Sequence, residues 1–368
     1  MGLPVNCEIN LHSSFPKGKR NLITDVPGVK VGHVTLEDAE KYIHTGVTAV
    51  LPHEGNLFQE KVLAGVSVIN GFGKSAGLVQ VEELGTIEAP ILMTNTFGVG
   101  TGLNGDIKYM LAQNPDIGTT TGTVNCVVTE CNDGSLSDIR GMHLKEEHVL
   151  EAIEGAGEDF AEGAVGGGTG MICMGLKGGI GSASRIIACD GGQYTLGAIV
   201  MSNFGVKRNL RIDGQRVDMT QRKTGQQGTV GQGTNKQNPA QPGTGQPEKI
   251  VHPSEKGSVI IVLATDIPLN ERQLKRVAKR ATVGIARVGS YLGNGSGDIA
   301  IAFSNGNRVP HYSDNDILTV KMFHDNAMDK IFEATAEVVE EAVISSLYHG
   351  EAMRGIRNRK VHGLREYL

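Results

Sequence analysis

The chain has 368 residues, 39% of them hydrophobic, so it can bury the core of one large α/β domain or of two smaller ones. The formal charge at neutral pH is −5, and no run of Lys or Arg is long enough to form a nucleic-acid or membrane-binding surface. These numbers favour a globular protein whose partners are small and neutral.

The cysteines and the first residues bear on the compartment. Five cysteines, odd in number and without a C-x-x-C pair, argue against a disulfide framework or zinc ribbon and indicate reduced thiols. Met1–Arg20 lacks an export signal, and no run of about 18 apolar residues follows. No H-E-x-x-H motif or close cluster of His and carboxylates occurs. The sequence predicts a cytoplasmic protein without a metal or organic cofactor.

Short β-branched runs separated by glycines predict buried strands with tight turns. They are Val29–Leu36, Gly46–Leu51, Ala64–Asn70, Pro90–Asn95, Val124–Glu130, Leu196–Asn203 and Val259–Asp266. Two helical patterns follow the last run. One extends from Asn270 to Arg287 and begins with Asn270 and Gln273 as a capping pair, and the other extends from Asn326 to Tyr348. Strands covered by helices predict a layered α/β fold.

One segment breaks this pattern. Residues 221–247 contain seven Gln and six Gly, and Val230 and Ala240 are their only apolar residues apart from glycine and proline. Such a segment buries too little surface to offset the entropy cost of ordering it, so we expect a mobile linker over about residues 215–255. A linker of this length inside a compact domain indicates either a function or a later cleavage.

Three motifs match known signatures without their required context. The stretch GFGKSA, Gly71–Ala76, fits a dinucleotide fingerprint, but the next strand ends in Asn95 where an acid is needed. The triplets of penicillin-recognising enzymes occur in the wrong order, at Ser14–Lys17, Lys223–Gly225 and Ser313–Asn315. The glycine-rich stretch Val165–Arg185 lacks G-x-x-x-x-G-K-[ST], so it predicts close backbone approaches instead of a phosphate site.

The Gly257–Ser258 pair joins the linker to the last apolar run. In an N-terminal nucleophile enzyme the catalytic residue begins a new chain, and its α-amine, with a pKa of about 7.7–8, acts as general base. Release of that amine needs a flexible approach and a small preceding residue, which the linker and Gly257 supply. The residues alone leave two interpretations open: an ordinary turn before a strand, or a self-cleaving nucleophile.

Longer motifs favour the second interpretation. They are Asn21–Leu36, Val68–Gly100, Val165–Arg185, Met201–Gly205, Lys256–Leu269 and Gly293–Ser304. Together they resemble the DmpA-type L-aminopeptidase D-amidase/D-esterase family, which includes β-peptidyl aminopeptidases. The resemblance implies a four-layer αββα sandwich, similar to N-terminal nucleophile hydrolases but with distinct connectivity. It also implies a single catalytic domain that cleaves itself into chains 1–257 and 258–368, and it suggests a homotetramer.

The resemblance also assigns roles to single residues. Ser258 is implied as the nucleophile, with Ser296 and Asp298 close to it and to its amine. A hydroxyl and a carboxylate can orient an ammonium group and tune it toward a working base. Asn203 is implied to lie near the oxyanion, to which a carboxamide N–H can donate. Glu130 is implied to hold the substrate's free amine. Asn132 stands where some members carry tyrosine, which leaves its own role open.

These expectations describe a serine aminopeptidase that releases N-terminal amino acids from short peptides, amides or esters through an acyl-enzyme on Ser258. Two other functions stay open: a non-processed binding or scaffold homologue, and an acyltransferase that uses the same nucleophile. Because pocket residues come from loops, the sequence does not decide between α- and β-amino acids or between L and D centres.

Overall fold

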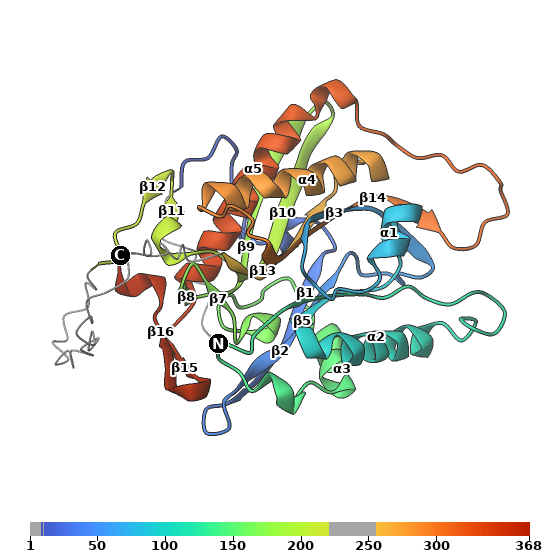
Figure 1. Ribbon diagram of the computed structural model, residues 1–368. Helices are drawn as coiled ribbons and strands as arrows, with labels where there is room; N and C mark the ends of the chain where they lie inside the picture. The colour runs from blue at the N-terminus through green and yellow to red at the C-terminus, as the bar shows by residue number, and fades with distance from the viewer. Residues whose placement is uncertain (1–8, 10, 221–254) are drawn as a thin grey trace, which may run out of the picture.

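The computed structural model describes residue 9, residues 11–220 and residues 255–368. Two sheets lie face to face between two layers of helices (Figure 1). The smaller sheet has the order β1 (Lys30–Asp38), β2 (Ile43–Leu51), β5 (Ile91–Asn95) and β6 (Val127–Cys131). The larger has the order β4 (Thr86–Ile87), β3 (Glu60–Gly71), β14 (Gly295–Pro310), β13 (Lys256–Thr265), β10 (Gly192–Asn203) and β9 (Gly179–Cys189).

The helices divide between the two outer layers. α4 (Glu271–Arg287) and α5 (Asp329–Tyr348) cover the larger sheet, and α2 (Val99–Gln113) and α3 (Glu146–Glu154) lie against the smaller one (Figure 1). The short helix α1 (Leu78–Leu84) follows β3. Three small hairpins complete the described chain: β7 (Ile172–Cys173) with β8 (Leu176–Lys177), β11 (Arg211–Ile212) with β12 (Gln215–Arg216), and β15 (Met353–Gly355) with β16 (Arg359–Val361).

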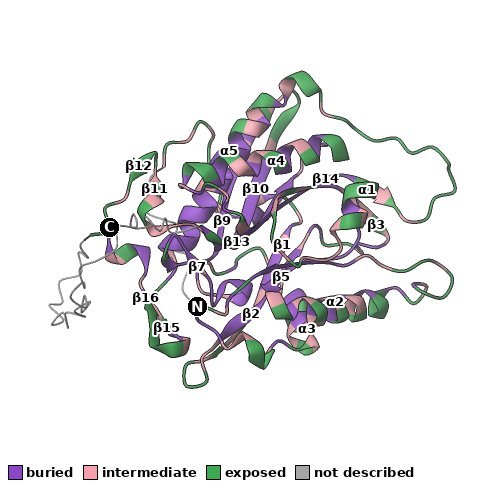
Figure 2. Ribbon diagram, viewed as in Figure 1, coloured by how far each residue is buried: buried purple, intermediate pink, exposed green. Residues whose placement is uncertain are grey.

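Strand β13 shows how the sequence builds four layers. Because successive side chains of a strand point to opposite faces, an uninterrupted apolar run can serve two cores. Val259, Ile261 and Leu263 pack with the helices α4 and α5, whereas Ile260 and Val262 pack toward the smaller sheet. Figure 2 shows the strands at the centre as buried and the exposed residues on the outer helices and loops. The expected αββα sandwich is therefore confirmed.

Local sequence signals place α4 well and α5 less well. The Asn270 carboxamide oxygen accepts from Gln273 N at 2.9 Å, and Asn270 N donates back to the Gln273 side chain at 3.2 Å, as the capping pair predicts. The C-terminal helix begins at Asp329 instead of Asn326, because Asp325–Ala327 forms a separate 3-10 turn before it. No helix in the described part of the chain is both long and apolar enough to cross a lipid bilayer.

The glycine-rich stretch packs backbone against backbone, as expected. A Cβ on Gly181 in β9 would lie 2.0 Å from the carbonyl oxygen of Ala342, so glycine allows α5 to approach the sheet. The GFGKSA stretch follows β3, whose neighbours β4 and β14 are both antiparallel to it, so it is not part of a βαβ nucleotide-binding unit.

The linker lies mostly outside the described residues. Within the expected range of about 215–255, Gln215–Arg216 is strand β12 and pairs with β11, so this part of the range is a hairpin. Residues 221–254, which include the Lys223–Gly225 triplet, are outside the described residues.

Candidate active site

The candidate nucleophile lies where three strands of the larger sheet run side by side. β13 pairs with β10 in an antiparallel register that sets Ser258 opposite Asn203. On its other side β13 runs parallel to β14, with Gly257 opposite Ser296 and with Asp298 two residues farther along. The strand register thus brings together four predicted catalytic residues and the glycine of the predicted cleavage site.

Gly257 occupies a conformation that other residues do not tolerate. Its φ is +129°, and a Cβ on it would lie 1.9 Å from the carbonyl oxygen of Asn203. The Ser258 Oγ donates to the Gly257 carbonyl oxygen at 2.6 Å, so the hydroxyl lies beside the carbonyl group of the preceding peptide bond. Glycine is therefore required here for steric reasons, beyond the flexibility that the sequence suggested.

Ser296 and Asp298 form a buried hydrogen-bonded pair on β14. The Ser296 Oγ donates to Asp298 Oδ1 at 2.6 Å, and both residues are at most 1% exposed. Burial raises the pKa of Asp298 to about 6; the hydrogen bond from Ser296 opposes this rise, and the negative charge of Glu255 adds to it. Asp298 Oδ2 has no hydrogen-bond partner within the described chain, so it can accept a proton or a hydrogen bond from an amine.

The Asn203 carboxamide is oriented by backbone groups on both sides. Its oxygen accepts from Ile172 N at 2.9 Å, and its nitrogen donates to the carbonyl oxygen of Asn132 at 3.0 Å. An amide nitrogen carries two N–H donors, so one donor remains beyond this bond for a ligand. The fixed orientation suits a group that stabilises developing negative charge.

Glu130, at the end of β6, is only 2% exposed and yet lines the same cavity as Ser258. One carboxylate oxygen accepts from Lys74 N at 2.8 Å, and the other accepts from the Thr96 hydroxyl. Asn132 is exposed, and its side-chain oxygen accepts from Gly134 N at 2.9 Å. Both residues line the cavity, and their roles stay predictions.

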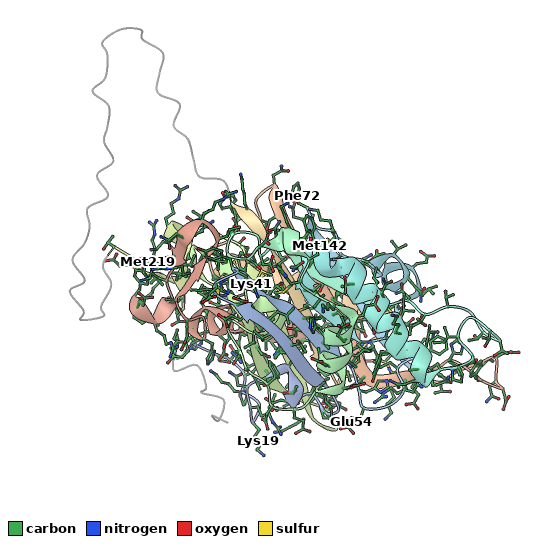
Figure 3. The ribbon with its side chains drawn as sticks, turned by 90° about the horizontal axis from the view of Figure 1, so that it is seen from below. Lys19, Lys41, Glu54, Phe72, Met142 and Met219 are labelled. Carbon is green, nitrogen blue, oxygen red and sulfur yellow. The ribbon has the colours of Figure 1, made fainter. Side chains whose placement is uncertain are left out.

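The cavity has a volume of about 460 Å³, which lies in the usual range for small-molecule sites. The end of β3, the β7–β8 turn and the β15–β16 hairpin supply walls around the candidate nucleophile. Its lining residues include Phe72, Lys74, Thr96, Glu130, Asn132, Ile172, Asn203, Lys256, Ser258 and Arg359. Phe72 is 60% exposed and lies at the edge of the molecule in Figure 3. Such a cavity accommodates a short peptide or amide.

Two residues near the site were missed by the sequence analysis. The Glu255 carboxylate is 1% exposed, accepts from the Ser290 hydroxyl and from Tyr291 N at 2.9 Å, and holds the chain three residues before Ser258. The Asn70 amide donates to the backbone carbonyl oxygen of Ser296. A single Glu beside a linker and an Asn at a strand end carry no distinctive pattern, so only the tertiary contacts identify them.

Across residue 9, residues 11–220 and residues 255–368, no group of three or more His, Cys, Asp or Glu side chains is arranged to hold a metal ion.

Known proteins are similar to this chain over nearly its whole length. The model of peptidase family S58 matches residues 21–361. The chain is 38% identical to the β-peptidyl aminopeptidase BapA of Sphingosinicella microcystinivorans over 355 residues, covering 94% of this chain and 86% of the relative.

Two solved structures extend the similarity to the fold. The PH0078 protein of Pyrococcus horikoshii OT3 has a TM-score of 0.84 and 49% identity, with 98% of this chain and 95% of that one covered. The L-aminopeptidase D-Ala-esterase/amidase of Ochrobactrum anthropi has a TM-score of 0.81 and 36% identity, with 96% and 93% covered. That enzyme is described as a prototype of the serine aminopeptidases and a new variant of the Ntn hydrolase fold. The chain thus belongs to peptidase family S58 and is a serine aminopeptidase, a hydrolase of peptide and amide bonds.

Proposed function

We propose that the chain cleaves itself between Gly257 and Ser258 and then acts on short peptides, amides and esters that carry a free amino group. The observation that carries this proposal is the position of Ser258. Its hydroxyl lies 2.6 Å from the Gly257 carbonyl oxygen. Ser258 lines the cavity, on the strand next to the Ser296–Asp298 pair.

Self-cleavage proceeds in two steps, formation of an ester and its hydrolysis. The Ser258 Oγ attacks the Gly257 carbonyl carbon and loses its proton, and the C–N bond breaks as that nitrogen gains a proton, which leaves an ester and a free α-amine. Water then hydrolyses the ester, giving a Gly257 carboxylate and a free Ser258 hydroxyl. The positive φ of Gly257 and its close approach to Asn203 hold the scissile peptide against β10.

In the processed enzyme the Ser258 α-amine takes the hydroxyl proton as Oγ attacks the substrate carbonyl, and it later donates a proton to the leaving amine. Ser296 and Asp298 orient this amine, because they form a buried hydroxyl–carboxylate pair on the adjacent strand. Asn203 donates its second N–H to the oxyanion. Water hydrolyses the acyl-enzyme and regenerates Ser258.

Glu130 binds the ammonium group of the substrate and so restricts the reaction to the first residue of a peptide. A buried carboxylate that lines the cavity and has no cationic side chain of the described residues bonded to it suits this role. The relatives include a β-peptidyl aminopeptidase and an L-aminopeptidase D-Ala-esterase/amidase. We therefore propose that this chain accepts both β-aminoacyl and α-aminoacyl substrates.

We also infer that the enzyme works in the cytoplasm as a homo-oligomer, with a tetramer as the expected state. The described cysteines Cys126, Cys131, Cys173 and Cys189 are all free, which suits a reducing compartment. Light scattering after size-exclusion chromatography measures the assembly, and a monomeric mass at micromolar concentration contradicts this part of the proposal.

Denaturing mass spectrometry tests the proposal as a whole. The wild-type protein should give two fragments, residues 1–257 and 258–368, whereas Ser258→Ala should remain a single chain and lose activity on L-alanyl and β-alanyl p-nitroanilides. Adding an amine acceptor separates hydrolysis from acyl transfer by its effect on the products. A wild-type protein that stays uncut and does not act on either anilide contradicts the proposal.

A further inference from the structure

The cavity is lined by more positive than negative side chains. Lys74, Lys256 and Arg359 line it, and Glu130 is the single carboxylate among its lining residues. If Glu130 binds the substrate ammonium, as proposed above, the cations are not needed to balance it. Lysine and arginine around a substrate cavity attract an anionic group, and this excess of positive charge requires a separate explanation.

These cations have no ion-pair partner in the part of the chain that the structure describes. Lys74 lies over the Phe72 ring, with its ammonium 4.6 Å from the ring centroid, and no ion pair involves Lys256 or Arg359 within the described residues. Lys74, Lys256 and Arg359 are exposed, whereas the buried Arg185 is paired with Glu337 and Glu341. The guanidinium of Arg359 is therefore free to bind a ligand.

The backbone around Arg359 is fixed on two sides. Arg359 begins β16, which pairs with β15. Between these strands, Ile356 N donates to the carbonyl oxygen of Leu136 at 2.8 Å, and just after β16 the carbonyl oxygen of His362 accepts from Lys177 N at 2.8 Å. The first bond ties the hairpin to the loop that carries Asn132, and the second ties it to β8. These bonds and the pairing with β15 hold the backbone of Arg359 beside the cavity.

Cleavage as proposed would leave Lys74 and Lys256 in one fragment and Arg359 in the other. Arg359 belongs to residues 258–368, the fragment that begins with the nucleophile, whereas Lys256 lies directly before the proposed C-terminal Gly257. Lys74 follows β3, and its backbone N–H is bonded to Glu130, so it lies on the ammonium-binding side. Arg359 is therefore the cation whose support is independent of both the cleaved segment and Glu130.

We propose that Arg359 binds the free carboxylate of the amino acid that leaves, so that dipeptides are preferred over the corresponding neutral amides. This inference rests on the aminopeptidase function proposed above. A guanidinium binds a carboxylate through two parallel hydrogen bonds, which gives orientation as well as charge. A dipeptide spans about 7 Å, so a cavity of about 460 Å³ can hold both of its charged ends.

The test compares β-alanyl-leucine with β-alanyl-leucinamide, which share the scissile bond and differ in one charge. Wild type should show the higher kcat/KM for the acid, and Arg359→Met should lower the value for the acid about tenfold while changing the amide less than about twofold. The kcat/KM of Arg359→Lys for the acid should fall between the values of wild type and Arg359→Met. Because the pair is partly exposed, added salt should reduce the preference.

Lys360→Met is the matched control, since the adjacent residue of a strand points to the opposite face and Lys360 does not line the cavity. This variant should leave the kcat/KM values for both substrates unchanged. Equal wild-type kcat/KM values for acid and amide, or an equal loss on both in Arg359→Met, overturn the inference.

A binding experiment separates this inference from the proposed function. Analogues in which a CH2–NH group replaces the scissile amide, one ending in a carboxylate and one in an amide, bind without being cleaved. Calorimetry should show tighter binding of the acid to wild type, and no such difference with Arg359→Met. If neither substrate is hydrolysed, the proposed aminopeptidase function is contradicted. Equal affinities of wild type for the two analogues contradict the Arg359 subsite, whether or not the substrates are hydrolysed.

Discussion

The substitution Gly257→Ala tests the geometry of self-cleavage most directly. A Cβ at this position would lie 1.9 Å from the carbonyl oxygen of Asn203, and the φ of +129° is one that alanine rarely adopts. Restoring an ordinary C···O separation of about 3.3 Å moves the two groups apart by about 1.4 Å. An unfavourable backbone conformation adds about 1–3 kcal/mol of strain.

The displaced group belongs to the peptide bond that we propose is cleaved. Since a misplacement of about 1 Å can reduce a rate about 100-fold, Gly257→Ala should slow the appearance of the 258–368 fragment at least about 100-fold. Denaturing gels of freshly purified protein, followed by mass spectrometry over several days, measure this rate. Thermal unfolding of the same samples establishes that the variant is folded.

Gly295→Ala is the matched control. Gly295 lies at the start of β14 and lines the same cavity, but a Cβ there would have Lys256 Cγ as its nearest atom, at an ordinary distance of 3.7 Å. This variant should cleave at nearly the wild-type rate. If Gly257→Ala cleaves as fast as Gly295→Ala, the close approach to Asn203 does not position the peptide, and the reasoning is refuted.

Three further predictions concern the remaining site residues. Asn203→Ala should lower kcat about 100- to 1,000-fold with a smaller change in KM, because we propose that the carboxamide acts on the oxyanion that forms during the reaction; steady-state kinetics on β-alanyl p-nitroanilide measure both. Glu130→Gln should raise KM at least about tenfold for substrates with a free amine and should change kcat less, because it removes the charge proposed to bind the ammonium. The third prediction uses the uncut Ser258→Ala protein, with and without Asp298→Asn. Urea denaturation should show that Asp298→Asn raises the free energy of unfolding more at pH 7 than at pH 4, by about 2–3 kcal/mol.

The sign of the last prediction follows from the raised pKa. Burial moves the pKa of Asp298 from 3.8 to about 6 in the folded protein, so the folded state binds the proton more tightly than the unfolded state. Stability therefore falls as the pH rises from about 4 to about 6 and levels off above that, and asparagine removes this dependence. Parallel stability profiles for the two proteins contradict the prediction. An unchanged kcat in Asn203→Ala, or an unchanged KM in Glu130→Gln, contradicts the role assigned to that residue.

The sequence by itself determined the local elements and the chemical type of the site. The Asn270–Gln273 capping pair and the apolar run after Ser258 are local signals, because a cap depends on residues three apart and a buried strand on its own side chains. The order of the longer motifs, through their family resemblance, indicated Ser258 and its companions. The start of α5 was predicted three residues early because the 3-10 turn at Asp325–Ala327 resembles a helix in its composition and spacing.

Only the tertiary structure decided how these groups meet. The register of β13 between β10 and β14 sets Gly257 against the carbonyl group of Asn203, and no local pattern specifies that register. The same holds for Glu255, whose partners begin 35 residues later, and for Arg359, which reaches the cavity through a hairpin anchored to Leu136. Pairing between distant segments depends on how whole layers pack, since each contact is favourable only after the chain between its partners has been ordered. For this reason the nucleophile could be predicted from the sequence, whereas the groups proposed to hold it and its substrate in place required the fold.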